Sequence, residues 1–247
     1  MRLNLLLKTS AFAVFITVCC FLGLNAQNLV IASGAGYKKP VTEIIENFEK
    51  QYHVEVDAIF GNLQMVASQA RESGEVACII GDKKFLARLG STVSFADYTP
   101  MGKGIIVLAY RKGITLDKLE DIVTDKVKSL FMPQSGKAIY GVAGKETLES
   151  LGYMSKVSDK LTQVATVPQV LSYLLTGEAD AGFINLTEAL ANKDKIGGYI
   201  IVPEDAYKPI EIVSGTVTGF ENKELTRQFV SYLDSETAKV IIKKHGL

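Results

Sequence analysis

From Leu29 onward the chain alternates between short apolar runs and segments whose apolar residues recur with a helical period. The run LVIAS (29–33) has the length and composition of a buried strand, and glycines follow it directly. Pro40 then suits the first turn of a helix whose apolar face runs from Ile44 to Tyr52. Repetition of this unit predicts an α/β protein in which helices flank mixed, mostly parallel sheets.

The remaining elements follow from the same criteria. Strands are expected at 54–60, 76–80, 104–110, 129–133, 160–165, 180–184, 197–203 and 209–217. Further helices are expected from Met65 to about Gly74 and at 114–122, 138–152, 167–177, 223–233 and 236–245. No internal repeat or low-complexity linker is visible between them.

The order of these elements indicates two lobes. The chain is expected to cross between them near 97–103 and again near 202–209. Residues 27–100 and 208–247 would then form the first lobe, with residues 101–207 inserted as the second lobe. Ligands of open α/β sheets bind outside the carboxyl ends of the strands, so we expect a ligand cleft between the lobes.

The first 26 residues have the pattern of a secretory signal peptide. Arg2 and Lys8 precede an apolar stretch from Ala11 to Leu24, and the small residue Ala26 follows. The stretch is shorter than the roughly 20 residues that a membrane-spanning helix needs. We therefore predict cleavage after Ala26 and export to the periplasm.

Cysteine usage agrees with an exported chain that has no internal disulfide. Cys19 and Cys20 fall within the leader, so Cys78 would be the one cysteine of the mature protein. Cys78 lies in an apolar run and is expected to be a small buried residue. A lipid anchor on Cys19 or Cys20 is the less favoured alternative, because Val18 is not the small residue that such processing prefers.

Charge and motif content exclude several classes of function. The chain has 27 basic and 27 acidic residues, and loss of Arg2 and Lys8 leaves the mature protein slightly acidic. Nucleic-acid binding needs a basic excess or stripe, so no nucleic-acid partner is expected. With only two histidines and no hydrolase, zinc-protease or dinucleotide-binding motif, we expect no enzyme, no cofactor and no metal site. Glu178 and Asp180 are interpreted as a solvated corner rather than an acid/base pair.

One local pattern recurs: a strand, a turn containing glycine or asparagine, and then the start of a helix. It occurs at 33–40, 60–64, 134–141, 165–169 and, more weakly, at 184–187. The first N–H groups of a helix have no partner within the helix, and they carry partial positive charge. Several such turns converging from two lobes would form an anion pocket made of neutral donors.

Sequence likeness to a known family covers nearly the whole chain from Leu29 to Leu247. It is carried by LVIASGAGYKKPVTEIIENFEKQYHVEVD (29–57), FGNLQMVASQ (60–69), AIYGVAGKETLESLGY (138–153) and VPQVLSYLLTGEADAGFIN (167–185). These segments resemble the periplasmic molybdate/tungstate-type substrate-binding proteins of ABC transporters. The resemblance implies a two-lobed type II periplasmic-binding fold that captures an oxyanion with uncharged donors and delivers it to an ABC permease. We expect a monomer.

The resemblance also implies where the ligand is bound. The matching positions are Gly36, Asn62 and Leu63 in the first lobe, and Tyr140, Val167 (through its backbone N–H) and Asn185 in the second. At three of them, 36, 62 and 185, the family commonly offers a hydroxyl, and the chain has glycine or asparagine instead. Cys78 stands where the family has an aspartate. Besides molybdate or tungstate, another small anion or an organic acid therefore stays open as the ligand.

Each of these residues also has a purely structural interpretation. Gly36 would be a turn residue with positive φ, and Asn62 and Asn185 would be helix N-caps. Tyr140 and Val167 would contribute packing alone. The alternatives from other functional classes are a secreted hydrolase or transferase, and a sensory domain that docks onto a membrane receptor.

Overall fold

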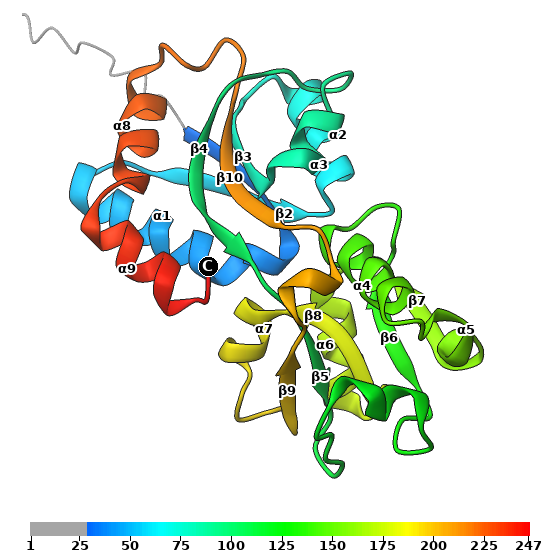
Figure 1. Ribbon diagram of the computed structural model, residues 1–247. Helices are drawn as coiled ribbons and strands as arrows, with labels where there is room; N and C mark the ends of the chain where they lie inside the picture. Colours follow the sequence, from blue (N-terminus) through cyan, green and yellow to red (C-terminus); the bar gives the residue numbers. More distant parts are fainter. Residues whose placement is uncertain (1–28) are drawn as a thin grey trace, which may run out of the picture.

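The computed structural model describes residues 29–247, which form two lobes, each built on one five-stranded sheet (Figure 1). The predicted leader, residues 1–26, lies outside the described residues, and Cys19 and Cys20 lie outside them with it. Between Leu29 and Leu247 no helix is both long and apolar enough to cross a membrane.

The sheet of the first lobe has the strand order β2-β1-β3-β10-β4. Its strands are β1 (Leu29–Gly34), β2 (Val56–Gly61), β3 (Val76–Asp82), β4 (Phe95–Gly104) and β10 (Ile210–Val217). β1 pairs in parallel with β2 and β3, whereas β10 runs antiparallel to β3 and β4. β1 and β3 are buried along their whole length, which explains why they are nearly continuous apolar runs.

Helices cover both faces of this sheet (Figure 1). α1 (Lys38–Tyr52), α8 (Glu224–Leu233) and α9 (Glu236–Lys244) lie on one face, and α2 (Leu63–Ser73) and α3 (Lys83–Arg88) lie on the other. Each face has its own apolar cluster: Ile80 belongs to the cluster that includes Phe48 of α1, and Ile79 to the one that includes Val66 of α2. Successive residues of a strand point to opposite faces, so adjacent isoleucines serve different clusters.

The sheet of the second lobe has the order β7-β6-β8-β5-β9. Its strands are β5 (Ile106–Tyr110), β6 (Leu130–Pro133), β7 (Leu161–Val164), β8 (Ala181–Asn185) and β9 (Gly198–Ile201). Its α-helices are α4 (Ile139–Ser150), α5 (Met154–Val157), α6 (Val167–Thr176) and α7 (Leu186–Ala191). Short 3-10 turns are η1 (Ala35–Tyr37) in the first lobe, and η2 (Leu119–Val123), η3 (Ser158–Lys160) and η4 (Glu204–Ala206).

Both sheets are mixed and mostly parallel, as expected from the sequence: in each sheet four of the five strands run in the same direction, and β10 or β5 runs opposite to them. In the second sheet β6 pairs in parallel with β7 and β8, while β5 runs antiparallel to β8 and β9. Each sheet thus has two parallel and two antiparallel pairings. The antiparallel pairs arise because β5 and β10 follow the crossings between lobes and not a helix of their own sheet.

In the first lobe, the helix α3 and the strand β4 lie where the sequence pattern predicts neither a helix nor a strand. β4 occupies the region 97–103 that was expected to cross between the lobes, so the chain leaves the first sheet only after Gly104. β4 forms the edge of the sheet, and its composition, with Pro100 and two glycines, is typical of an edge strand rather than a central one. The chain returns to the first sheet between β9, which ends at Ile201, and β10, which begins at Ile210.

The prediction of a helix at 114–122 is wrong for residues 114–118. Only η2, from Leu119 to Val123, is helical there. The backbone N–H groups of Asp117 and Lys118 both donate to the Asp121 carboxylate, at 2.8 and 3.4 Å. A side chain at the third helical position that accepts the N-cap N–H marks a helix start, so the helical turn begins at Leu119 and not at Ile114.

Candidate ligand-binding site

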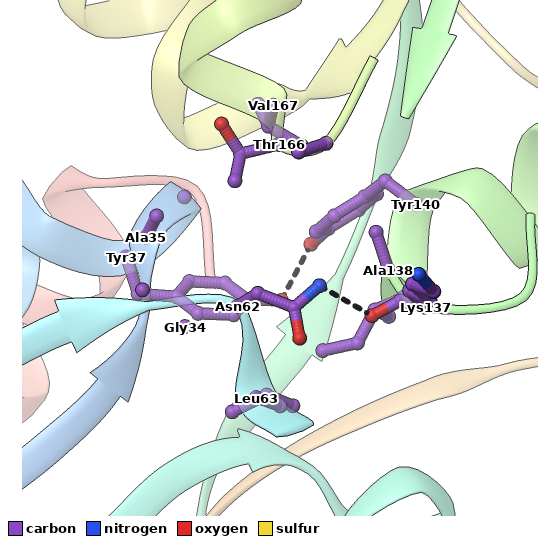
Figure 2. Close-up of a pocket in the computed structure, with 14 residues that line it drawn as sticks. Gly34, Ala35, Tyr37, Asn62, Leu63, Lys137, Ala138, Tyr140, Thr166 and Val167 are labelled. Carbon is purple, nitrogen blue, oxygen red and sulfur yellow. Dashed lines mark hydrogen bonds between the residues drawn. The ribbon is translucent and has the colours of Figure 1, made fainter. Parts of the chain in front are cut away.

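Four strand–turn–helix junctions meet between the lobes and enclose a small cavity (Figure 2). Two junctions come from the first lobe (β1 to η1 and β2 to α2) and two from the second (β6 to α4 and β7 to α6). The cavity is lined by Gly34, Ala35, Gly36, Tyr37, Gly61, Asn62, Leu63, Lys137, Ala138, Ile139, Tyr140, Ala165, Thr166 and Val167. Its volume of about 40 Å³ is a few times the roughly 10–15 Å³ that one water needs, so it suits an ion of a few heavy atoms.

The start of α6 leaves one backbone donor for this cavity. Thr166 caps the helix by accepting the Gln169 N–H, and the Val170 N–H bonds to the Thr166 carbonyl. Pro168 has no N–H to offer. Of the first four positions of the helix, Val167 alone therefore has an N–H without a partner in the helix, and Val167 lines the cavity.

The start of α4 contributes in the same way. Ala138, at the N-cap, has no side chain that could cap the helix. The Gly141 and Val142 N–H groups both bond to the Ala138 carbonyl, which leaves the N–H groups of Ile139 and Tyr140 at the cavity wall. Backbone donors of this kind attract an anion without any charged side chain.

Asn62 is the N-cap of α2 and also bonds to the other lobe. Its Oδ1 accepts the Gln64 N–H at 2.9 Å, and its Nδ2 donates to the Lys137 carbonyl at 3.1 Å (Figure 2). The N-cap interpretation is therefore confirmed, and the cap closes over the cavity from the first lobe to the second. Leu63, the next residue, is the first residue of α2, so its backbone N–H has no hydrogen-bond partner within the helix.

Two tyrosine hydroxyls meet at the cavity across the junction between the lobes. The Oη atoms of Tyr37 and Tyr140 lie 2.8 Å apart (Figure 2), and both side chains are buried. Burial raises the pKa of each hydroxyl well above its ordinary value, and the buried carboxylate of Asp82 acts in the same direction. Both hydroxyls are therefore neutral. Of the two hydroxyl protons, one lies in the hydrogen bond between the Tyr37 and Tyr140 oxygens. The other O–H remains available to donate to a third group.

Asn185 differs from the other predicted site residues because it does not line the cavity. It is fully buried behind the first turn, where its Nδ2 donates to the Gly36 carbonyl at 2.8 Å. Its Oδ1 caps α7 by accepting the Glu188 N–H at 3.2 Å. The structure thus brings Gly36, Asn62, Leu63, Tyr140 and Val167 to one cavity and places Asn185 one layer behind it.

The sequence suggested a positive φ as the structural reason for a glycine at position 36, and the structure shows a different reason. Gly36 is not among the glycines with positive φ. A Cβ there would lie 3.1 Å from Asn185 Nδ2 and 3.6 Å from Val167 Cβ, so the space is already occupied from the second lobe.

The lining residues that were not predicted as site residues include three with polar side chains: Tyr37, Lys137 and Thr166. Tyr37 directly follows Gly36, but only the packing of the lobes directs its hydroxyl toward Tyr140. Lys137 is exposed at the rim and is the one charged residue among those that line the cavity; no carboxylate lines it.

The residues considered for catalysis have structural roles. The Nε2 of His245 lies 2.8 Å from a carboxylate oxygen of Glu43 within the first lobe. Asp180 is not a solvated corner: it is buried and accepts from Arg111 Nε at 2.9 Å and from two backbone N–H groups. Cys78 is fully buried as predicted, and burial raises the pKa of its thiol to about 11.

A second, larger hollow lies between α3 and α4. It has a volume of about 400 Å³ and is lined by charged side chains that include Lys84, Arg88, Glu146 and Lys208. The Lys208 Nζ is already paired with Glu146 at 3.3 Å. Because it lacks the convergence of several helix starts, this hollow is the weaker candidate for an anion site.

Two mixed α/β lobes joined by two crossings, with a small cavity of backbone donors between them, define a solute-binding protein. The family model described as "Bacterial extracellular solute-binding protein" matches residues 29–247, and the chain belongs to this family. The resemblance seen in the sequence is thereby confirmed. Family and fold are those of solute-binding proteins and not of enzymes.

Curated relatives match over most of their length. The "Putative ABC transporter substrate-binding lipoprotein YvgL" of Bacillus subtilis (strain 168) is 29% identical over 224 residues, which cover 88% of this chain and 85% of the relative. The "Molybdate-binding protein ModA" of Azotobacter vinelandii is 26% identical over 227 residues, 90% of each chain.

Solved structures show the same fold. The Azotobacter vinelandii periplasmic molybdate-binding protein superposes with a TM-score of 0.80 at 22% identity, covering 88% of this chain and 97% of that chain. L-phospholactate-bound PEB3 superposes with a TM-score of 0.75 at 17% identity, covering 88% and 98%. The expected two-lobed type II periplasmic-binding fold is confirmed.

Proposed function

We propose that this protein captures a tetrahedral oxyanion of the molybdate or tungstate type outside the cytoplasm and delivers it to an ABC permease. The observation that carries the proposal is the cavity of about 40 Å³ at which four helix starts meet and which no carboxylate lines. Such a cavity offers an anion several hydrogen-bond donors and no repelling charge.

In the proposed complex, donors from both lobes surround the anion. Gly36 and Leu63 supply backbone N–H groups from the first lobe, and Val167 supplies one from the second. Tyr140 donates through the hydroxyl pair that it forms with Tyr37. Asn62 contributes by holding the start of α2 and bonding to the opposite lobe. Lobe closure removes water, which makes each hydrogen bond to the charged ligand stronger.

The donor set favours a fully deprotonated anion. Monohydrogen phosphate has an O–H that needs an acceptor, and no carboxylate lines the cavity to provide one. A buried donor left unpaired costs about 1–3 kcal/mol, so phosphate should bind roughly ten- to a hundredfold more weakly than molybdate or tungstate.

The cellular setting belongs to the same proposal. The ABC permease is the partner that the relatives' names indicate. Export by the leader at residues 1–26 would place the protein in the periplasm, as a monomer that meets the permease in the membrane.

Thermal unfolding of residues 27–247 with a panel of anions tests the proposal. Molybdate and tungstate should raise the melting temperature in proportion to the logarithm of their concentration, because they bind only the folded protein. Sulfate and phosphate should have smaller effects. Unchanged melting with every oxyanion would refute an oxyanion ligand.

A small organic acid is the second candidate, because Lys137 lies at the rim where a second anionic group would reach it. The solved structure of L-phospholactate-bound PEB3 has the same fold. This candidate predicts that organic or phosphorylated acids stabilise the protein, that Asn62→Ala and Asn185→Ala both abolish this effect, and that molybdate has none.

A further inference from the structure

Asn185 joins the two lobes directly behind the first ligand turn. It ends β8 in the second lobe, and its Nδ2 donates at 2.8 Å to the carbonyl of Gly36 in the first lobe. We propose that Asn185 is a positioning residue that couples lobe closure to the shape of the turn 34–37, and that it does not donate to the ligand. This inference rests on the proposed oxyanion-binding function.

The amide of Asn185 is bonded to protein groups on both sides and does not line the cavity. Its Oδ1 accepts from the Glu188 N–H. Its Nδ2 donates to the Gly36 carbonyl. The side chain is fully buried and does not line the cavity, so a ligand there would meet the turn 34–37 and not the Asn185 amide.

Gly36 and Asn185 depend on one another. A Cβ at position 36 would approach Asn185 Nδ2 to 3.1 Å, which is tighter than ordinary packing. A serine at position 36, which would restore a hydroxyl to the turn, must therefore displace the Asn185 amide. The glycine and the asparagine act as a matched pair, because the space that a side chain at position 36 would need holds the Asn185 amide.

A second contact ties the same helix to the first lobe. Glu188, which follows Asn185 on α7, lies 3.6 Å from Lys39 Nζ of α1, and its carboxylate also accepts from Asn192 Nδ2 at 3.1 Å. The carboxylate side chain is only 7% exposed. The start of α7 thus faces the start of α1 across the junction, and the Asn185–Gly36 bond forms only when the lobes come together.

A contact made on closing should govern ligand release and not ligand entry. Ligand first meets the open form, so the association rate should not depend on Asn185. Loss of the bond should instead speed dissociation. The loss of one buried hydrogen bond predicts an increase of about tenfold.

Stopped-flow kinetics with molybdate would compare wild type with Asn185→Ser. Serine keeps an oxygen that can cap α7, but its shorter side chain ends before the Gly36 carbonyl. Asn47→Ala is the matched control, because Asn47 Nδ2 also donates to a backbone carbonyl at 2.8 Å but stays within α1. We expect Asn185→Ser to dissociate about tenfold faster with an unchanged association rate and an unchanged molybdate-to-sulfate preference, and Asn47→Ala to behave as wild type.

Gly36→Ser tests the matched pair. It should weaken molybdate binding strongly in wild type and much less in the Asn185→Ser background, where the space is free. Additive effects of the two substitutions would contradict the coupling. A changed anion preference in Asn185→Ser would overturn the proposal by showing that Asn185 touches the ligand.

Amide hydrogen exchange gives a readout that needs no ligand. The turn 34–37 should exchange faster in Asn185→Ser than in Asn47→Ala, and equal exchange would overturn the positioning role. If wild type binds none of the oxyanions, the proposed function fails, and the exchange comparison still decides the role of Asn185.

Discussion

The hydroxyl oxygens of Tyr37 and Tyr140 lie 2.8 Å apart, although the two residues belong to different lobes and are 103 positions apart in the sequence. Tyr37 follows the first ligand turn, and Tyr140 lies in the first turn of α4. The bond connects the two walls of the cavity at a point where neither hydroxyl can ionise readily. The bond therefore requires the two lobes to be together, and the same hydroxyl pair supplies a neutral donor for the ligand.

Removing either hydroxyl should weaken anion binding. Tyr140→Phe keeps the ring but leaves the Tyr37 hydroxyl without its partner. One lost buried hydrogen bond costs about 1–2 kcal/mol, so the dissociation constant should rise about tenfold. Tyr37→Phe should have a similar effect. Tyr199→Phe, in β9 at the far edge of the second sheet, is the control and should bind as wild type does.

The pair also predicts how binding depends on pH. Burial raises the pKa of Tyr37 and Tyr140 above the ordinary tyrosine value of 10.0, so the neutral donors persist as pH rises to that value and are lost only above it. Molybdate affinity measured by calorimetry should therefore be constant from about pH 7 to about pH 9.5. A fall in affinity that begins below about pH 9 would show that another group controls binding.

Asn62 can be dissected because its two hydrogen bonds use different atoms. Asn62→Asp keeps the oxygen that caps α2 but replaces the donor to the Lys137 carbonyl with a negative charge at the cavity. It should leave stability nearly unchanged and abolish anion binding. Asn62→Ala loses the cap as well and should cost about 1 kcal/mol in the free energy of unfolding.

Ser235→Ala is the matched control for capping. Ser235 caps α9 by accepting the Ala238 N–H at 3.2 Å, far from the cavity. It should lower stability by about 1 kcal/mol in urea unfolding without changing anion affinity. Normal binding by Asn62→Asp would contradict the placement of Asn62 at the anion.

Asp180 should stabilise the second lobe and do so in a pH-dependent way. Burial tends to raise the pKa of Asp180, but hydrogen bonds from Lys128, Arg111 and Ser129 outweigh this and lower it below its ordinary value. Its contribution is present above the unfolded-state pKa of about 3.9 and is lost as pH falls through the lower folded-state value.

Asp180→Asn should therefore reduce the free energy of unfolding by about 2 kcal/mol at neutral pH, and by less below about pH 3. Chemical unfolding at both pH values measures the difference. Asp194→Asn, an exposed site in the same lobe, should have no comparable effect. A pH-independent loss in Asp180→Asn would point to packing and not to charge.

Much of the fold could be predicted because its central strands are buried on both faces. Apolar runs such as 29–33 and 76–80 fit only the buried interior of a sheet. The ends of α2 and α6 were also predictable, because Gly74 and Gly177 adopt the left-handed conformation that ends a helix. β4 escaped prediction because an edge strand needs no apolar run. Its residues alternate irregularly between buried and exposed positions.

The site was predictable where it depends on local structure and not where it depends on packing between lobes. Helix starts at Asn62 and Val167 follow from neighbouring residues in the sequence. The partner of Asn185 is 149 positions away, so nothing near Asn185 distinguishes a ligand donor from a bond between lobes. The same holds for Tyr37, whose hydroxyl meets its partner only in the folded molecule.

Isothermal titration of residues 27–247 with molybdate, followed by tungstate, sulfate and phosphate, tests the central claim most directly. We predict one molybdate or tungstate bound per chain, with phosphate at least about tenfold weaker because no carboxylate lines the cavity to accept its proton. An absence of binding heat with all four anions at several temperatures, or tighter binding of phosphate than of molybdate, would contradict a neutral-donor oxyanion site.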